Sequence, residues 1–118
     1  MNIIHTADHN GEQIVKVPLV NSRRHAILYP NDFKLLLSLD VRPKWYYIDG
    51  HVMVNVPKPE QNYRHGYCPI SRLIMDAGPR QIVKYLNRNR LDLRRSNLLL
   101  AVGQGKYRAR ELLKAENA

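Results

Sequence analysis

Four arginines stand within eight positions of the chain, and their spacing indicates chemistry with phosphate. Arg88, Arg90, Arg94 and Arg95 lie in the segment 82–101, with asparagines between them and apolar residues on both sides. A guanidinium group keeps its charge at physiological pH and donates paired hydrogen bonds that fit two phosphate oxygens. Such contacts supply affinity but little sequence information. The cluster therefore predicts a surface that grips a polyanion.

The net charge of the chain is concentrated in its second half. The 118 residues include 19 Lys and Arg against 10 Asp and Glu, a formal charge of +9. Residues 1–68 carry eight basic and six acidic side chains, hence +2, whereas residues 69–118 carry eleven and four, hence +7. A basic half of this kind indicates a nucleic-acid partner. The alternative is a soluble protein that simply has a high isoelectric point.

Short apolar segments on either side of the arginines are expected to position them. The predicted elements after residue 80 are strands at 81–86 and 97–102 and a helix over 103–117. On that helix Lys106, Arg110 and Lys114 lie four residues apart and form a basic stripe beside an apolar one. A solvated face gives the same pattern, and for an isolated helix it is the commoner explanation.

The preceding residues predict a mixed α+β fold. Residues 1–11 are expected to be a weakly ordered lead-in. The predicted elements are strands at 12–20 and 24–29, a helix over 29–40, a hairpin over 44–56, a loop over 57–67 and a short helix over 70–78. Asn31 or Asp32 is expected to cap the first helix, Asp49-Gly50 fits the hairpin turn, and Gly78-Pro79 is expected to end the second helix.

Two regions follow from this order of elements. Residues 1–68 form a small strand–helix–hairpin region and residues 69–118 a strand–loop–strand–helix module, and we expect the two to pack as one compact unit. Trp45, Tyr46 and Tyr47 in the hairpin have the types that stack on bases, although strand aromatics are more often core. Arg23 and Arg24 at a turn are equally compatible with a second phosphate contact and with solubility.

Composition excludes several classes of protein. Cys68 is the single cysteine, so neither an internal disulfide nor a CxxC zinc site is expected, which fits a reducing cytosol. The spacing of His65 and Cys68 resembles that of metal ligands, but there is no second pair. The N-terminal residues do not have the pattern of a signal peptide, and no apolar run has the length of a membrane span. We expect a cytoplasmic protein without a metal or other cofactor and without a membrane partner.

The segment RLIM…IVKYLNRNRLDLRRSNLLLAV resembles the homing-type HNH endonucleases that are common in phages and mobile introns. Their pattern is roughly HRLIM, a spacer, VDHINGNxLDNRRSNLRxAT, and a helix with paired asparagines. The matching residues are Arg72, Leu73, Ile74, Met75, Asn87, Asn89, Leu91, Asp92, Arg94, Arg95, Ser96, Asn97 and Leu98. The resemblance covers roughly residues 16–110, with a family-like N-terminal extension. It implies a ββα-metal module, and a phage or prophage origin in a bacterial host cell.

The positions that carry catalysis in this family are replaced. The resemblance places a metal-binding Asp and a water-activating His where this chain has Lys84 and Tyr85, and a metal-binding Asn where it has Lys106. The family's first His corresponds to Ser71. Magnesium requires oxygen ligands, whereas lysine offers only donors and a positive charge. The reference pKa of tyrosine, about 10, makes a poor base at neutral pH.

These substitutions predict a site that has exchanged metal for protein cations. We expect the ammonium groups of Lys84 and Lys106 to lie together near the former metal position and to neutralise a backbone phosphate. The predicted nucleic-acid contacts are Arg72, Lys84, Tyr85, Arg88, Arg90, Arg94, Arg95, Lys106, Arg110 and Lys114. Of the two arginines Arg94 and Arg95, one is expected to face phosphate and the other to brace the loop by pairing with Asp92. Asp92, Ser96 and Asn97 are expected to build the loop through side-chain hydrogen bonds to the backbone.

The leading functional hypothesis is a DNA-binding protein that does not cleave, such as a transcriptional regulator or an accessory factor. Double-stranded DNA is its expected partner, and a homodimer would supply specificity that one small module lacks. One alternative is a phage protein that binds and modulates a host protein. Two lesser alternatives are a nuclease with a rearranged site and a covalent attack on DNA by Tyr85.

Overall fold

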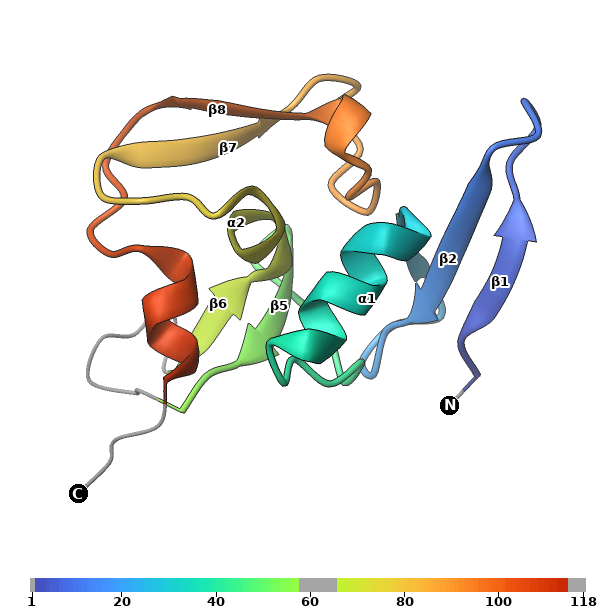
Figure 1. The fold of residues 1–118 in the computed structure, drawn as a ribbon, viewed down its shortest axis with the longest axis horizontal. Helices are drawn as coiled ribbons and strands as arrows, with labels where there is room; N and C mark the ends of the chain where they lie inside the picture. Colours follow the sequence, from blue (N-terminus) through green and yellow to red (C-terminus); the bar gives the residue numbers. More distant parts are fainter. Residues whose placement is uncertain (1, 58–65, 115–118) are drawn as a thin grey trace.

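The computed structural model describes residues 2–57 and 66–114 of the chain and shows a mixed α+β fold with small antiparallel sheets and two α-helices (Figure 1). The first sheet has the order β1-β2-β3, built from β1 (Ile4–Ala7), β2 (Gln13–Pro18) and β3 (His25–Leu28). The predicted lead-in over residues 1–11 is therefore wrong. Ile4–Ala7 pairs antiparallel with the segment from Gln13 to Lys16, and this cross-strand pairing supplies order that local sequence does not indicate.

The first helix, α1 (Pro30–Ser38), begins and ends by backbone geometry. Tyr29 is the N-cap residue, but its side chain makes no capping hydrogen bond. Pro30 is the first helical residue, a position whose N–H has no partner inside a helix, so the missing N–H of proline costs nothing there. The predicted cap at Asn31 or Asp32 is wrong, since both lie inside the helix. At the other end Asp40 adopts a φ of 62°, and Val41 N–H donates to the Leu36 carbonyl at 2.9 Å. This is a Schellman-type end, which turns the chain sharply.

The second sheet confirms the predicted hairpin and adds a strand. It has the order β4-β5-β6, from β4 (Tyr46–Ile48), β5 (His51–Asn55) and β6 (Tyr67–Pro69). Asp49 and Gly50 have φ values of 52° and 80°, so the two central residues of the turn are both left-handed. That is the geometry of a type I′ turn, whose twist matches the flanking strands. His51 therefore follows the turn immediately.

The second helix, α2 (Ile70–Met75), ends earlier than the sequence predicts. Asp76 takes a left-handed conformation with a φ of 50° and the Ala77 N–H returns to the Arg72 carbonyl, so the helix stops before Gly78-Pro79. The guanidinium groups of Arg95 and Arg110 donate to carbonyls of this last turn. These bonds satisfy carbonyl groups that have no partner inside the helix.

The basic half of the chain contains the predicted pair of strands but not the predicted helix. Strands β7 (Gln81–Tyr85) and β8 (Leu98–Val102) pair antiparallel, with the one-turn 3-10 helix η2 (Arg95–Asn97) before β8. Within the predicted helix of 103–117, the described residues form only the 3-10 helix η3 (Ala109–Leu113). The helix starts late because the segment after β8 is hydrogen-bonded to the residue before β7. The Arg80 N–H donates to the Gly105 carbonyl, and the Gly103 N–H donates to the Arg80 carbonyl.

One hydrophobic core joins the two halves. Figure 1 shows α1 and α2 between the β1–β2 edge and the β7–β8 ribbon, with β5 and β6 beneath α2. The largest fully buried side chains are Trp45, Leu28, Leu36, Ile70, Leu73, Ile74, Leu93, Leu112, Val15, Val17, Val52 and Cys68. Trp45 is thus core, as the strand aromatics were expected to be, whereas Tyr46 and Tyr47 are half-buried. Among the described residues, none of the helices has the length and apolar character that a membrane span requires.

The buried thiol allows a test of core integrity. Burial raises the pKa of Cys68 to about 12, which leaves almost no thiolate at pH 8. We expect a thiol reagent such as DTNB to label the native protein at least about a hundredfold more slowly than the urea-unfolded protein. Equal labelling rates would contradict the position of Cys68 in the core. The prediction requires only absorbance measurements against time.

Candidate nucleic-acid interface

A buried carboxylate organises the arginine-rich loop between β7 and β8. Asp92 is 2% exposed, and its oxygens accept hydrogen bonds from Arg94 Nε at 2.9 Å, Arg94 Nη2 at 2.8 Å and Asn87 Nδ2 at 2.9 Å. The Arg94 backbone N–H adds a fourth bond at 3.2 Å. Burial by itself would raise the pKa of Asp92, but the bonds from Arg94 and Asn87 outweigh it and hold the pKa below its usual value. Asp92 is therefore a charged hub of the loop.

The loop is also fastened to the N-terminal sheet. Ile27 N–H donates to the Leu91 carbonyl at 2.8 Å, and Leu93 N–H donates to the Ile27 carbonyl at 2.7 Å. Asn97 closes the base of the loop, since its Oδ1 accepts from Asn87 N–H at 2.7 Å and its Nδ2 donates to the Asp92 carbonyl at 2.9 Å. Asp92 and Asn97 thus have the loop-building bonds that were predicted. Ser96 differs, because its hydroxyl pairs with the Tyr29 hydroxyl at 2.8 Å instead of with the backbone.

A cationic groove lies beside this loop, on one side of β7. The groove has a volume of about 510 Å³ and is lined by His51, Ile82, Val83, Lys84, Tyr85, Arg88 and Arg90. Lys84 and Arg88 are exposed, and the structure gives their side chains no hydrogen bond or ion pair to any residue in 2–57 or 66–114. We call this set of seven residues the β7 groove. Two of its cations therefore face solvent with their full charge.

Arg88, like Arg80, has a left-handed backbone conformation that is uncommon for a long side chain, and of the two only Arg88 is among the described residues that line the β7 groove. Its φ is 64°, in the left-handed region, where a residue with a Cβ is disfavoured by about 1–2 kcal/mol. Its N–H donates to the Tyr85 carbonyl at 3.1 Å, which closes a turn directly after β7. The turn places Arg88 among the residues that line the groove, and the structure gives its side chain no hydrogen bond or ion pair to another described residue.

Arg90 is held against the wall of the groove. Its Nη1 lies 2.9 Å from His51 Nε2 and donates to the Gly50 carbonyl at 3.3 Å, while its Cζ lies 5.7 Å from the centre of the Tyr85 ring. A guanidinium over an aromatic face is attracted by the ring quadrupole. These three contacts keep Arg90 at the groove mouth, and none of them uses its Nε or Nη2.

Tyr85 and Ser71 contact each other. The resemblance to HNH endonucleases implies a histidine at each of these two positions. The Tyr85 hydroxyl donates to Ser71 Oγ at 2.8 Å. Burial raises the pKa of Tyr85, and this effect is larger than the opposing effects of the Ser71 hydrogen bond and the Arg90 charge. The phenol therefore stays protonated at neutral pH.

Several residues that were predicted to contact nucleic acid do not line the β7 groove. Two of them, Arg72 and Arg94, are held by other groups of the protein. Arg72 is 5% exposed and donates to the carbonyls of Gln81, Gly78 and Tyr107, so it is a structural residue and not a surface contact. Arg94 pairs with Asp92 and, at 2.9 Å, with Asp8 Oδ2. Of the two possibilities for Arg94 and Arg95, Arg94 is thus the residue that braces the loop. Its half-buried guanidinium leaves no free fork for phosphate.

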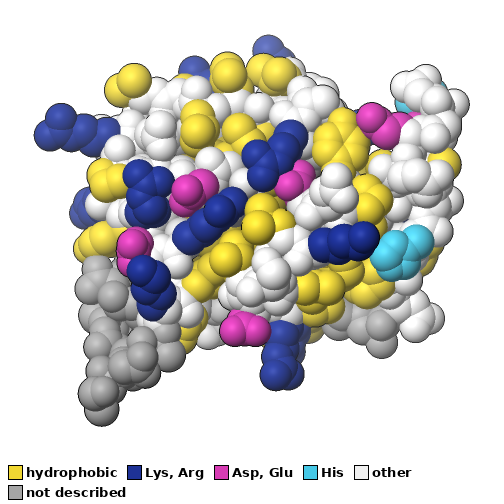
Figure 2. Space-filling view, viewed as in Figure 1, with side chains coloured by type: hydrophobic (Ala, Val, Ile, Leu, Met, Phe, Trp, Pro, Cys, Tyr) yellow, Lys and Arg dark blue, Asp and Glu magenta, His cyan; other side chains and the backbone are white. Residues whose placement is uncertain are grey.

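The remaining predicted cations do not meet at the groove. Arg95 pairs with Asp32 at 2.8 Å, and Arg110 donates to Leu73 and Ile74 carbonyls. Lys114 pairs with Glu111 at 3.1 Å. The predicted stripe of Lys106, Arg110 and Lys114 is therefore wrong, because Lys106 precedes η3 and Arg110 turns inward. Figure 2 shows Lys and Arg side chains interspersed with acidic ones on the face over α2 and η3.

Lys106, which was predicted to lie beside Lys84, is not among the described residues that line the β7 groove. Lys106 follows Gly105, whose carbonyl bonds to Arg80 at the start of β7, whereas Lys84 lies near the end of the strand. Four residues of extended chain span about 13 Å. The residues that line the β7 groove include Lys84 but not Lys106. The cations that do join Lys84 are Arg88 and Arg90.

Sequence reasoning missed His51 as a groove residue. The cue was present, because the Asp49-Gly50 turn places His51 at the first position of β5, but nothing local shows which loop this end of the hairpin faces. Of His65 and Cys68, whose spacing resembles that of metal ligands but for which no zinc site was expected, His65 lies outside the described residues. Within 2–57 and 66–114, no group of three or more His, Cys, Asp or Glu side chains has the arrangement of a metal site.

Comparisons of the chain with protein-family models, with curated proteins and with solved structures found no match in any of the three.

Proposed function

We propose that the chain binds double-stranded DNA through phosphates that enter the β7 groove, and that it does not cleave the DNA. The observation that carries the proposal is the placement of Arg88. A long cationic side chain stands at a left-handed position where glycine would be less strained, and the structure gives it no partner in the described chain. Strain of this kind is retained at binding sites, where the ligand supplies the compensating interaction.

The charges of the groove support phosphate as the ligand. Lys84 and Arg88 are open to solvent, and Arg90 is held beside them by the Tyr85 ring and by His51. Three cations around one hollow match the charge density of a duplex backbone, where condensed counterions are released when a protein replaces them. Such a grip is independent of sequence.

The chemistry of the groove supports binding without cleavage. The resemblance to HNH endonucleases implies a metal-binding Asp at position 84, and the lysine there offers an ammonium group in place of the oxygen ligand that magnesium requires. The Tyr85 hydroxyl is engaged with Ser71, and burial raises its pKa, so it does not supply a base near neutral pH. Both features favour a ligand that carries its own negative charge over a metal ion with activated water.

We further propose that β7, the loop over 86–97 and β8 are the remnant of an HNH-type ββα module, with η3 in place of its last helix. The support is the LDxRRSNL motif together with the antiparallel pairing of β7 and β8. A regulator or accessory factor of phage origin is the role that this ancestry suggests. A single groove contacts few phosphates, so selective binding would require a dimer or help from the N-terminal sheet.

A paired binding and nicking assay tests the proposed function. We expect fluorescence anisotropy to show salt-sensitive binding to a labelled duplex of about 25 base pairs, as phosphate contacts require. Supercoiled plasmid incubated with the same protein in magnesium or manganese should remain supercoiled. Nicking that EDTA abolishes would refute the non-cleaving proposal, and the absence of any duplex binding would refute the DNA proposal itself.

Replacing Arg88 with glycine separates stability from binding. Glycine relieves about 1–2 kcal/mol of left-handed strain, although its greater freedom in the unfolded chain offsets about 0.4–1 kcal/mol of that gain. We expect the free energy of unfolding of Arg88→Gly to equal or slightly exceed that of the parent in urea titrations. Duplex affinity should nevertheless fall several-fold.

Arg88→Lys is the matched control, because it keeps the charge and the strain. It should retain most of the duplex affinity without any gain in stability. If Arg88→Gly bound duplex as tightly as the parent, the strained position would have no role in binding.

A further inference from the structure

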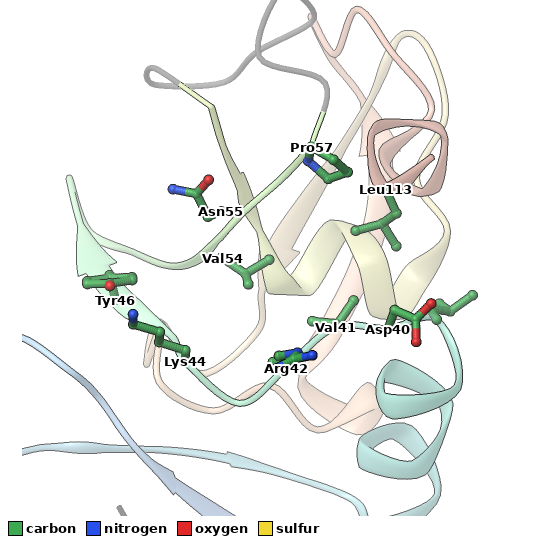
Figure 3. A pocket seen from close by; sticks show the side chains of 10 residues that line it. Asp40, Val41, Arg42, Lys44, Tyr46, Val54, Asn55, Pro57 and Leu113 are labelled. Carbon is green, nitrogen blue, oxygen red and sulfur yellow. The ribbon is translucent and has the colours of Figure 1, made fainter. Parts of the chain in front are cut away.

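A second pocket lies at the other end of β5 from the β7 groove. It has a volume of about 500 Å³ and is lined by Leu39, Asp40, Val41, Arg42, Lys44, Tyr46, Val54, Asn55, Pro57 and Leu113 (Figure 3). His51, at the start of β5, lines the β7 groove, and Asn55, at the end of β5, lines this second pocket. Four residues of extended strand, about 13 Å, therefore separate these two positions. We call these ten residues the hairpin pocket. Its size lies within the range of sites that hold small ligands or single bulky side chains.

The wall of the hairpin pocket is fixed by hydrogen bonds. The Schellman end of α1 sets the path of Asp40 and Val41. Beyond it, the Arg42 carbonyl accepts from Lys44 N–H at 2.8 Å and from Trp45 Nε1 at 2.9 Å. The Trp45 ring is fully buried, so it anchors this turn to the core. A preformed wall lowers the ordering cost of binding.

The floor of the pocket is aliphatic and its rim is cationic. Val41 and Val54 are buried, and Figure 3 shows Val41, Val54 and Leu113 around the hollow, with Arg42, Lys44 and Tyr46 along one side. Arg42 and Lys44 are exposed, and the structure gives neither side chain a hydrogen bond or ion pair within the described parts of the chain. An apolar floor beside two open cations is complementary to a ligand with an apolar group flanked by carboxylates.

We infer that the hairpin pocket docks an acidic segment of a partner protein, with one apolar side chain of that segment on the aliphatic floor and its carboxylates at Arg42 and Lys44. This surface is additional to the proposed DNA groove and does not depend on it. Nucleic acid fits the pocket less well. Among the described residues that line it, Tyr46 is the single aromatic side chain available for stacking, and the Asp40 carboxylate repels phosphate. An acidic peptide avoids repulsion by the Asp40 carboxylate if its apolar residue, and not one of its carboxylates, lies on the Asp40 side of the pocket.

A peptide array provides the test. The probes are acidic nonapeptides with a central Leu, Ile, Phe or Trp, each paired with one that has the central residue replaced by Asp and one that has its acids replaced by Lys. We expect labelled full-length protein to bind some acidic peptides with apolar centres and to bind neither kind of paired control. Binding to the Lys-containing peptides, or to none of the peptides, would overturn the inference.

Crossed variants locate the binding site. Arg42→Glu with Lys44→Glu should weaken the selected peptide at least about tenfold, because like charges then face each other. Lys84→Ala with Arg88→Ala should leave peptide binding unchanged, and thermal melts should show that both variants fold. An equal loss in both variants would overturn the inference, as would displacement of the peptide by an oligothymidine as effectively as by unlabelled peptide. The result is independent of duplex binding, so each proposal can fail alone.

Discussion

Asp92→Ala is expected to lower the free energy of unfolding by about 3–5 kcal/mol, which is the cost of removing one partner from a buried charge pair. The carboxylate is almost fully buried and accepts four hydrogen bonds from Arg94 and Asn87. Its loss removes the acceptor of the Asn87 amide and leaves Arg94 with Asp8 at 2.9 Å and the exposed Glu12 at 4.0 Å as its carboxylate partners among the described residues. Urea titrations followed by far-UV circular dichroism measure the change.

A control substitution separates this effect from the loss of any acidic residue. Glu111→Ala removes an exposed carboxylate whose partner is the exposed Lys114, and the expected change is within about 1 kcal/mol. If Asp92→Ala lowered the free energy of unfolding by as little, the Asp92 carboxylate would not be needed to hold the loop together.

The same carboxylate predicts how stability depends on pH. The pKa of Asp92 is lowered in the folded protein, so its contribution is fully present above the unfolded value near 4 and is lost as pH falls through the lower folded value. The Glu12 backbone N–H lowers the pKa of Asp8 in the same direction. We expect melting temperatures to fall as pH decreases below about 4, with a shallower fall in Asp92→Asn. Parallel curves would contradict the assignment.

The second large effect concerns DNA affinity. Lys84→Ala combined with Arg88→Ala is expected to weaken duplex binding about 60-fold at 0.1 M salt, because each phosphate contact contributes roughly eightfold at that concentration. Both side chains are exposed and lack partners in the described chain, so the variant should retain the parent's melting temperature. Anisotropy with a labelled duplex measures the affinity.

The control for this variant removes two positive charges from the hairpin pocket instead of from the β7 groove. Arg42→Ala with Lys44→Ala lowers the net charge by the same two units but leaves the β7 groove intact. We expect a loss of duplex affinity below about threefold. Equal losses in the two variants would show that DNA responds to net charge and not to the groove.

Local signals predicted those elements that local sequence determines. The Asp49-Gly50 turn, the pair of strands around the arginines and the first helix all depend on turn chemistry or apolar periodicity within a short window. The predicted α+β class follows from their order. Strand β1 was missed because its order comes from pairing with β2, which the composition of residues 1–11 does not signal.

The prediction of a helix over 103–117 was wrong for a reason that lies outside this segment. Gly105 passes so close to the Gln81 carbonyl and the Arg72 guanidinium that a side chain there would collide with them. The segment is bound to the start of β7 at Arg80, and helix formation begins only at Ala109, as a 3-10 turn. The predicted position of Lys106 depended on this helix, so it failed as well.

The candidate site was predicted in part, because side-chain type does not reveal direction. Lys84, Tyr85, Arg88 and Arg90 do share one groove, since they belong to one strand and the turn that follows it. Arg72 was taken for a surface cation, but three backbone carbonyls that converge on it from distant segments make it a buried structural residue. The roles of Arg94 and Arg95 depend on Asp8 and Asp32, more than sixty residues away.

The salt dependence of duplex binding tests the proposed phosphate grip most directly. The slope of log affinity against log salt counts the phosphates that the protein neutralises, at about 0.9 per contact. We expect Lys84→Ala with Arg88→Ala to flatten the slope by about 1.8 relative to the parent, while Arg42→Ala with Lys44→Ala leaves it unchanged. Identical slopes for the parent and the groove variant would show that neither side chain contacts the DNA backbone.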